Sequence, residues 1–132
     1  MSLLSGFLTV VFLTSANPRP SPPPPPAAYG LSANDPIPVG GESFESGPRY
    51  ERAYLNHLRG PRGERIAYER TGSCCPFETP NSPFGAGLLD VYRVTYPGMA
   101  EPVDLYLNMY DPPPARAPSA PVPAPPGFTY VE

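Results

Sequence analysis

The chain of 132 residues contains no lysine, and histidine occurs only once, at His57. The absence of lysine excludes a Schiff-base lysine, a P-loop lysine and a lysine general base. A single histidine also excludes a metal site with several histidine ligands. The formal net charge is −3, so the sequence offers no basic patch and we expect no nucleic-acid partner.

Proline is abundant instead, with 24 residues concentrated in two runs, Pro18–Pro26 and Pro112–Pro126. Such runs favour polyproline II and have little apolar surface to bury, so they predict tethers or disordered tails. We therefore divide the chain into a linker (17–28), a small domain (29–111) and a disordered proline-rich tail (112–132). A domain of about 80 residues can fold alone, although its stability margin is thin.

The N-terminus carries an apolar run from Leu3 to Thr14, which is too short to span a bilayer comfortably. Thr14 and Ala16 suit the −3 and −1 positions of a signal-peptidase site, so we predict a secretory signal peptide over residues 1–16. Its removal would leave a mature chain outside the cytosol, without a transmembrane span. The alternative is a buried strand or helix, because no lysine or arginine precedes the apolar run.

One helix is predicted over Pro48–Arg59, with Ser46 as its cap. Proline suits the first turn of a helix, and the dipeptide Gly60–Pro61 is a stop signal. Bulky apolar side chains recur at helical spacing: Tyr50, Tyr54, Leu55 and Leu58. The alternative is a strand over Tyr54–Leu58 that leads into a hairpin turn.

Three strands are predicted from alternating or β-branched and aromatic patterns, over Glu64–Gly72, Leu88–Tyr96 and Pro102–Tyr110. The connection between the last two is short enough for an antiparallel hairpin. Ile37 and Val39 alternate with prolines, which suits an edge strand. The expected fold class is α+β, a small and mainly antiparallel sheet with one helix packed on its apolar face.

The only two cysteines, Cys74 and Cys75, are adjacent, and four interpretations of them compete. They could form a vicinal disulfide in a tight turn, or two buried thiols that act as small hydrophobes. A metal site is the third interpretation, although the spacing matches no zinc module. The fourth is a catalytic thiolate, which requires His57 nearby and an orienting group such as Asp90 or Asp104.

The loop Glu78–Gly87 follows the cysteines and is long for so small a domain, and long loops more often carry function. We expect Phe77 and Phe84 to pin this loop onto the core. No catalytic, cofactor-binding or metal-ligating residue is assigned. The candidate functional loop comprises Cys74, Cys75, Phe77, Asn81 and Phe84, and the candidate polar partners are His57 and Asp90.

Four blocks of the sequence stand out as motifs: DPIPVGG (35–41), YLNHLRGPRGE (54–64), GSCCPFETPN (72–81) and GLLDVYRVTYPG with PVDLYLNMYD (87–111). Through them the chain resembles a family of small exported bacterial envelope proteins, for which the GSCCPF and LYLNMYD blocks are specific. The resemblance implies a location in the periplasm or cell envelope. Proteins of this family are often labelled 2-dehydro-3-deoxyphosphooctonate aldolase.

Three functions are therefore considered. The first is a non-enzymatic, extracytoplasmic structural or binding module, whose partner would be an envelope protein or a glycan. The second is a small thiol or redox protein that uses Cys74 and Cys75. The third is the aldolase of the family label, but enzymes of that name are TIM barrels of about 250 residues. The short chain and its lack of lysine argue against the aldolase, the small number of catalytic side chains in a small core favours the first function, and no cofactor is predicted.

Overall fold

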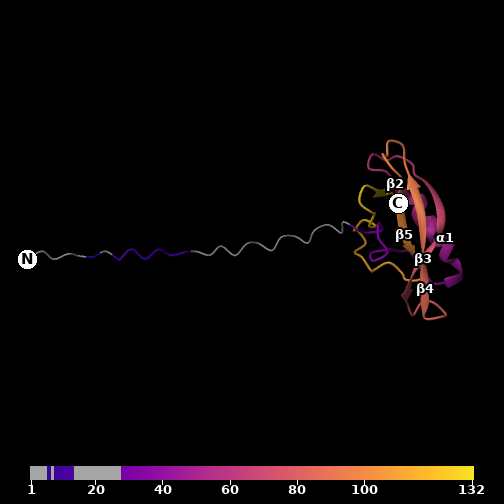
Figure 1. Ribbon diagram of the computed structural model, residues 1–132, viewed down its shortest axis with the longest axis horizontal. Helices are drawn as coiled ribbons and strands as arrows, with labels where there is room; N and C mark the ends of the chain where they lie inside the picture. The colour runs from indigo at the N-terminus through magenta and orange to yellow at the C-terminus, as the bar shows by residue number, and fades with distance from the viewer. Residues whose placement is uncertain (1–5, 7, 14–27) are drawn as a thin grey trace, which may run out of the picture.

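A computed structural model of the chain describes residues 6, 8–13 and 28–132. The predicted signal peptide (1–16) and linker (17–28) lie mostly outside the described residues. Residues 8–13 are exposed and form no helix or strand, and the folded part starts at residue 28 (Figure 1). Within the described ranges, no helix has the length and apolar character that a membrane crossing requires.

The sheet contains four strands in the order β1-β5-β4-β3. Strands β3 (Ala67–Glu78), β4 (Ala86–Thr95) and β5 (Val103–Asn108) are antiparallel neighbours, which confirms the predicted hairpin between the last two. Strand β1 (Ile37–Pro38) pairs in parallel with β5 at the sheet edge. An edge position suits proline, since it cannot donate to a sheet ladder. The predicted α+β class is confirmed.

Helix α1 (Gly47–His57) follows a short 3₁₀ turn, η1 (Phe44–Ser46), and lies within two residues of the predicted helix. Pro48 occupies its first turn as expected, but the side chain of Ser46 makes no capping hydrogen bond. The helix ends before the predicted glycine because Leu58 already adopts extended backbone angles. Leu58 and Arg59 instead form a short strand, β2 (Leu58–Arg59).

The core lies between α1 and one face of the sheet. Fully buried there are Leu55 of α1, Leu58 of β2, and Leu105 and Leu107 of β5, and they belong to a single cluster with Tyr54. The alternation along β5 follows the predicted period of two from Val103 to Leu107, since Asp104 is exposed and Tyr106, between the buried Leu105 and Leu107, is only half-buried. Each buried leucine contributes about 2 kcal/mol of hydrophobic stabilisation.

The segment 112–132 differs from the predicted disordered tail. Residues 112–119 are exposed, but strand β6 (Thr129–Tyr130) pairs antiparallel with β2, and Phe128 belongs to the core cluster. The prediction of a disordered tail was based on the proline content of this segment. Apolar side chains of the same segment, such as Phe128, nevertheless have enough apolar surface to pack into the core. The folded unit therefore includes the C-terminal residues.

Replacing Phe128 tests whether this C-terminal segment belongs to the folded unit. Phe128 is 9% exposed and packs edge-on against Tyr96, with ring centroids 5.6 Å apart. We expect Phe128→Ala to lower the free energy of unfolding by about 3 kcal/mol, measured by urea denaturation. The control Val131→Ala, at a side chain that is 40% exposed, should change it by less than about 0.5 kcal/mol. Equal stabilities of the two variants would contradict this assignment.

Candidate functional site

Helix α1 lines two hollows with different side chains. The first, here called the acid cavity, has a volume of about 350 Å³ and is lined by Glu51, Arg70, Ser73, Asp90, Tyr92 and Tyr110, among others. The second, here called the aromatic groove, has a volume of about 400 Å³. Its rings come from Tyr29, Tyr50, Tyr54, His57 and Tyr130, and the chain's own prolines Pro113, Pro114 and Pro123 form part of its wall.

Strand geometry gathers the polar groups of the acid cavity. Asp90 and Tyr92 are two residues apart on β4 and therefore point to the same face. On β3, Arg70 lies opposite Tyr92 and Ser73 lies opposite Asp90, with a register shift between Arg70 and Gly72. This bulge inserts one extra residue, so that Arg70 and Ser73, three positions apart, reach the same cluster.

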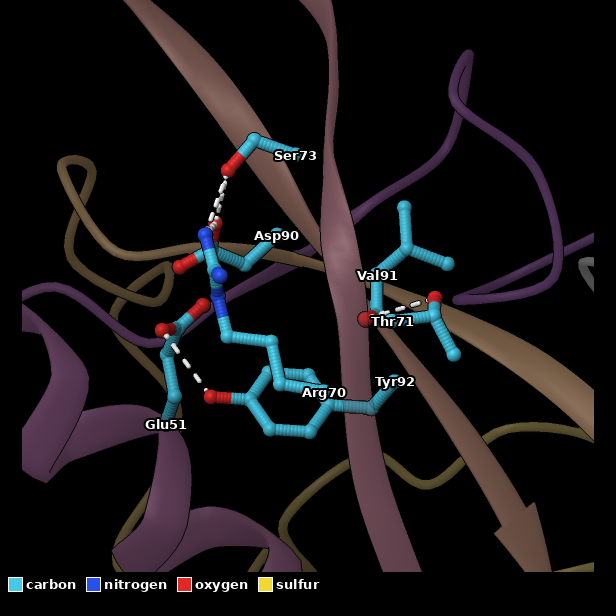
Figure 2. Close-up of polar contacts among 7 residues, drawn as sticks. All are labelled: Glu51, Arg70, Thr71, Ser73, Asp90, Val91 and Tyr92. Atoms are coloured by element: carbon cyan, nitrogen blue, oxygen red, sulfur yellow. Dashed lines mark hydrogen bonds and ion pairs between the residues drawn. The ribbon is translucent and has the colours of Figure 1, made fainter.

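Glu51 on α1 is fully buried, and it is the carboxyl group of the acid cavity that is protonated at neutral pH. The Tyr92 hydroxyl donates to Glu51 Oε1 at 3.3 Å, while no donor among the described residues reaches Glu51 Oε2. Burial and the hydrogen bond with Asp90 raise the pKa of Glu51 to about 9. Glu51 is therefore a neutral acid at neutral pH, and Figure 2 shows its carboxyl group beside the Asp90 carboxylate.

Asp90 has the opposite environment, although it is also buried. Burial alone would raise its pKa, but hydrogen bonds from Arg70, Glu51 and Ser73 outweigh it and hold the pKa below its usual value. Arg70 Nη2 lies 2.9 Å from Asp90 Oδ1, and Ser73 Oγ donates to the same oxygen at 2.7 Å. The cluster thus contains one carboxylate and one carboxylic acid at neutral pH.

A neutral acid beside a carboxylate is the charge arrangement of many acid–base catalysts. In this cavity, however, the polar groups bind one another: Glu51 accepts from the Tyr92 hydroxyl, and Asp90 accepts from Arg70 and Ser73. The arrangement ties the helix to two strands of the sheet. Across residues 28–132, no group of three or more His, Cys, Asp or Glu side chains is placed to hold a metal ion.

Cys74 and Cys75 form a vicinal disulfide, which is the first of the four interpretations. They lie within β3 and not in a free turn, at a second irregularity between Cys74 and Phe77. Cys75 has a φ of 64°, a left-handed conformation that is uncommon for a residue other than glycine. Both sulfurs are bonded to each other, so this oxidised form presents no thiolate nucleophile or thiolate metal ligand.

The candidate loop is anchored differently from the expectation. Phe77 packs edge-on against Tyr110, but Phe84 is 86% exposed and pins nothing to the core. The loop is fastened by polar groups, since Thr79 Oγ1 and Asn81 Nδ2 both donate to Asp111 Oδ1. These bonds hold the base of the loop without an aromatic anchor at its tip.

The two candidate polar partners lie in different hollows. His57 lines the aromatic groove, where its ring stacks on Tyr130 and its Nδ1 lies 2.7 Å from the carbonyl oxygen of Ala53. Asp90 lines the acid cavity. The arrangement of His57, Asp90 and a cysteine considered for a catalytic thiolate is therefore not formed.

The aromatic groove already holds a proline-containing segment of the same chain. The Tyr54 hydroxyl donates to the carbonyl oxygen of Pro123 at 2.7 Å. Burial raises the pKa of Tyr54, so the hydroxyl remains a donor at all physiological pH values. The Tyr54 ring packs against Tyr130, with centroids 5.3 Å apart. The groove thus combines flat rings with one fixed hydrogen-bond donor.

Two residues that line these hollows, Glu51 and Tyr130, were not identified from the sequence. Glu51 was not singled out, although it precedes Tyr54 by three and Leu55 by four positions. This spacing places it on the buried stripe and could have identified it. Tyr130 was missed because it was assigned to a disordered tail.

Comparisons with protein-family models, with curated proteins and with solved structures found no match to the chain. The resemblance to exported envelope proteins, described from the sequence blocks, therefore stays a prediction. The roles assigned to the acid cavity and to the aromatic groove rest on their geometry.

The proton on Glu51 generates a pH-dependent stability. Its pKa is about 9 in the folded chain, against 4.5 for the ordinary side chain, so folding takes up a proton between these values. This contribution is complete below pH 4.5 and is lost as the pH rises towards 9. Relative to Glu51→Gln, the wild type should lose up to about 1.4 kcal/mol of unfolding free energy per pH unit.

Glutamine is the appropriate comparison because it imitates the neutral acid, with an amide that donates to Asp90 and a carbonyl that accepts from Tyr92. Urea denaturation at several values between pH 5 and pH 8.5 measures the effect. The matched control is Glu69→Gln, at an exposed position of β3, which should leave the wild-type pH dependence intact. Parallel stability curves for wild type and Glu51→Gln would show that Glu51 is already ionised in the folded chain.

Proposed function

We propose that this chain is a non-enzymatic binding module that works outside the cytosol, in the periplasm or cell envelope. Its ligand would be a proline-rich, extended segment of an envelope protein, bound in the aromatic groove. The observation that carries the proposal is the hydrogen bond from the Tyr54 hydroxyl to the carbonyl oxygen of Pro123 between aromatic rings.

This contact has the chemistry of polyproline recognition. Domains that bind proline-rich peptides use grooves lined by aromatic side chains, and the ligand arrives in a preformed polyproline II helix with little entropy to lose. Prolyl carbonyls have no neighbouring N–H partner within such a helix, so a tyrosine hydroxyl is a suitable donor. The open volume of about 400 Å³ beside Pro113 and Pro114 leaves room for further contacts of this kind.

The location outside the cytosol is supported by the oxidised cysteine pair, because disulfides form and persist in oxidising compartments. The predicted signal peptide and the resemblance to exported envelope proteins agree with it.

A binding role is also supported by the fold and by the acid cavity. Aldolases that share the family label are built on TIM barrels, whereas residues 28–132 form a four-stranded sheet with one α-helix and a two-stranded sheet. The acid of the cavity is bonded to Tyr92 of β4, and the carboxylate is bonded to Arg70 and Ser73 of β3. We therefore assign the cavity a structural role and the aromatic groove the binding role.

Binding of a fluorescein-labelled hexaproline peptide to the full chain tests the proposal. We expect a saturable increase in fluorescence anisotropy. His57 lines the groove, is itself exposed and lies outside the core, so His57→Ala should preserve the fold and weaken binding about five- to tenfold.

The matched control for this titration is Arg49→Ala, an exposed position of the same helix that does not line the groove. It should bind the peptide as the wild type does. Absence of saturable binding, or equal weakening by both substitutions, would argue against the groove as the binding site.

A second candidate, a thiol or redox protein, is favoured by one observation. The disulfide is only half-buried, and Cys75 holds a left-handed backbone conformation that costs energy in a residue with a side chain. Reduction of the pair would release this local strain.

Alkylation with iodoacetamide followed by mass spectrometry tests the state of the cysteines. The native chain should take up no label without reductant, and two labels per chain after reduction, because both sulfurs are in one disulfide. If the hexaproline affinity is the same in both states, the disulfide is structural; a large change would favour the redox function. Labelling of both thiols without reductant would contradict the vicinal disulfide.

A further inference from the structure

We propose that the chain's own N-terminal proline run, Pro18–Pro26, binds in the open part of the aromatic groove and competes there with other proline-rich segments. This inference rests on the proposed function of the groove. It adds the identity of one ligand, which is encoded in the same chain.

The first argument is where the run ends. The run stops at Pro26, and Tyr29, three positions later, already lines the groove. The position of Tyr29 is fixed by its neighbour, because the Gly30 carbonyl oxygen accepts a hydrogen bond from the backbone of Tyr106 in β5 at 2.8 Å. The run is thus attached to the rim of the groove through two intervening residues.

The second argument is chemical fit. The groove contacts prolines of the C-terminal segment, at Pro113, Pro114 and Pro123, and its lining is mostly aromatic and apolar. Tyr50 and His57 project from α1 into the same hollow. The N-terminal run offers the same residue type, with five consecutive prolines at Pro22–Pro26.

The third argument is reach and effective concentration. At 3.1 Å per residue, nine residues in polyproline II cover about 28 Å. A ligand on a short connection has an effective concentration in the millimolar range. With an intrinsic dissociation constant of about 0.1 mM, the run would occupy most grooves and weaken a competing peptide about tenfold.

The test compares the full chain with a variant that carries Pro22→Ser, Pro23→Ser, Pro24→Ser, Pro25→Ser and Pro26→Ser. Labelled hexaproline should bind about tenfold more tightly to the variant. His57 is the only histidine, so its ring protons give unique NMR signals inside the groove. These signals should differ between the two chains without any peptide. The matched control is Pro118→Ser with Pro121→Ser, at exposed prolines, and it should behave as wild type.

The outcomes separate this inference from the function on which it rests. Equal peptide affinities with identical His57 signals would overturn the inference and leave the groove as a binding site. Unchanged His57 signals without hexaproline binding to either chain would overturn both. A difference that grows with protein concentration would place the run in the groove of a second copy and overturn the intrachain assignment.

Discussion

The buried carboxyl group of Glu51 on α1 meets Tyr92 and Asp90 of β4, and this polar contact joins the helix that lines both hollows to the sheet. Consecutive residues of a helix are rotated by about 100°. Once Glu51 is turned towards β4, Tyr54 and Leu55 follow on the buried side, and Tyr50 and His57 reach the aromatic groove. Removing one partner of such a buried pair would leave an uncompensated polar group, so the pair specifies one helix rotation over others.

Two irregularities in β3 help to position the side chains around Asp90 and Tyr110. The bulge before Gly72 brings Arg70 and Ser73 to Asp90, and without it the two side chains would alternate to opposite faces. The second irregularity, at the cysteine pair, precedes Phe77, whose ring contacts Tyr110. Tyr110 also stacks on Phe44 in the turn before α1. The vicinal disulfide thus stands between the polar cluster and an aromatic cluster, which suits a structural role.

The elements that follow simple periodicity could be predicted, and the ones that depend on tertiary context could not. The alternation in β5 and the apolar stripe of α1 were sufficient because burial alone decides them. Glu51 was not identified from the sequence, because a charged residue predicts a solvated position. Only the fold places its side chain beside Asp90. Phe128 and β6 were hidden behind a proline run, whose composition predicts disorder. The exposure of Phe84 follows from the polar anchoring of its loop at Asp111.

Proline-rich segments and an aromatic groove in one chain have a common physical basis. A polyproline II segment loses little conformational entropy when it is bound, so modest contacts such as the one between Tyr54 and Pro123 can hold it. The contact is also reversible, because each proline contributes only a small contact energy. A groove that retains the C-terminal segment by this means has the chemistry to accept another proline-rich segment, and the one with the shortest connection is Pro18–Pro26. Under the proposed function, this run would compete with an external proline-rich peptide for the open part of the groove.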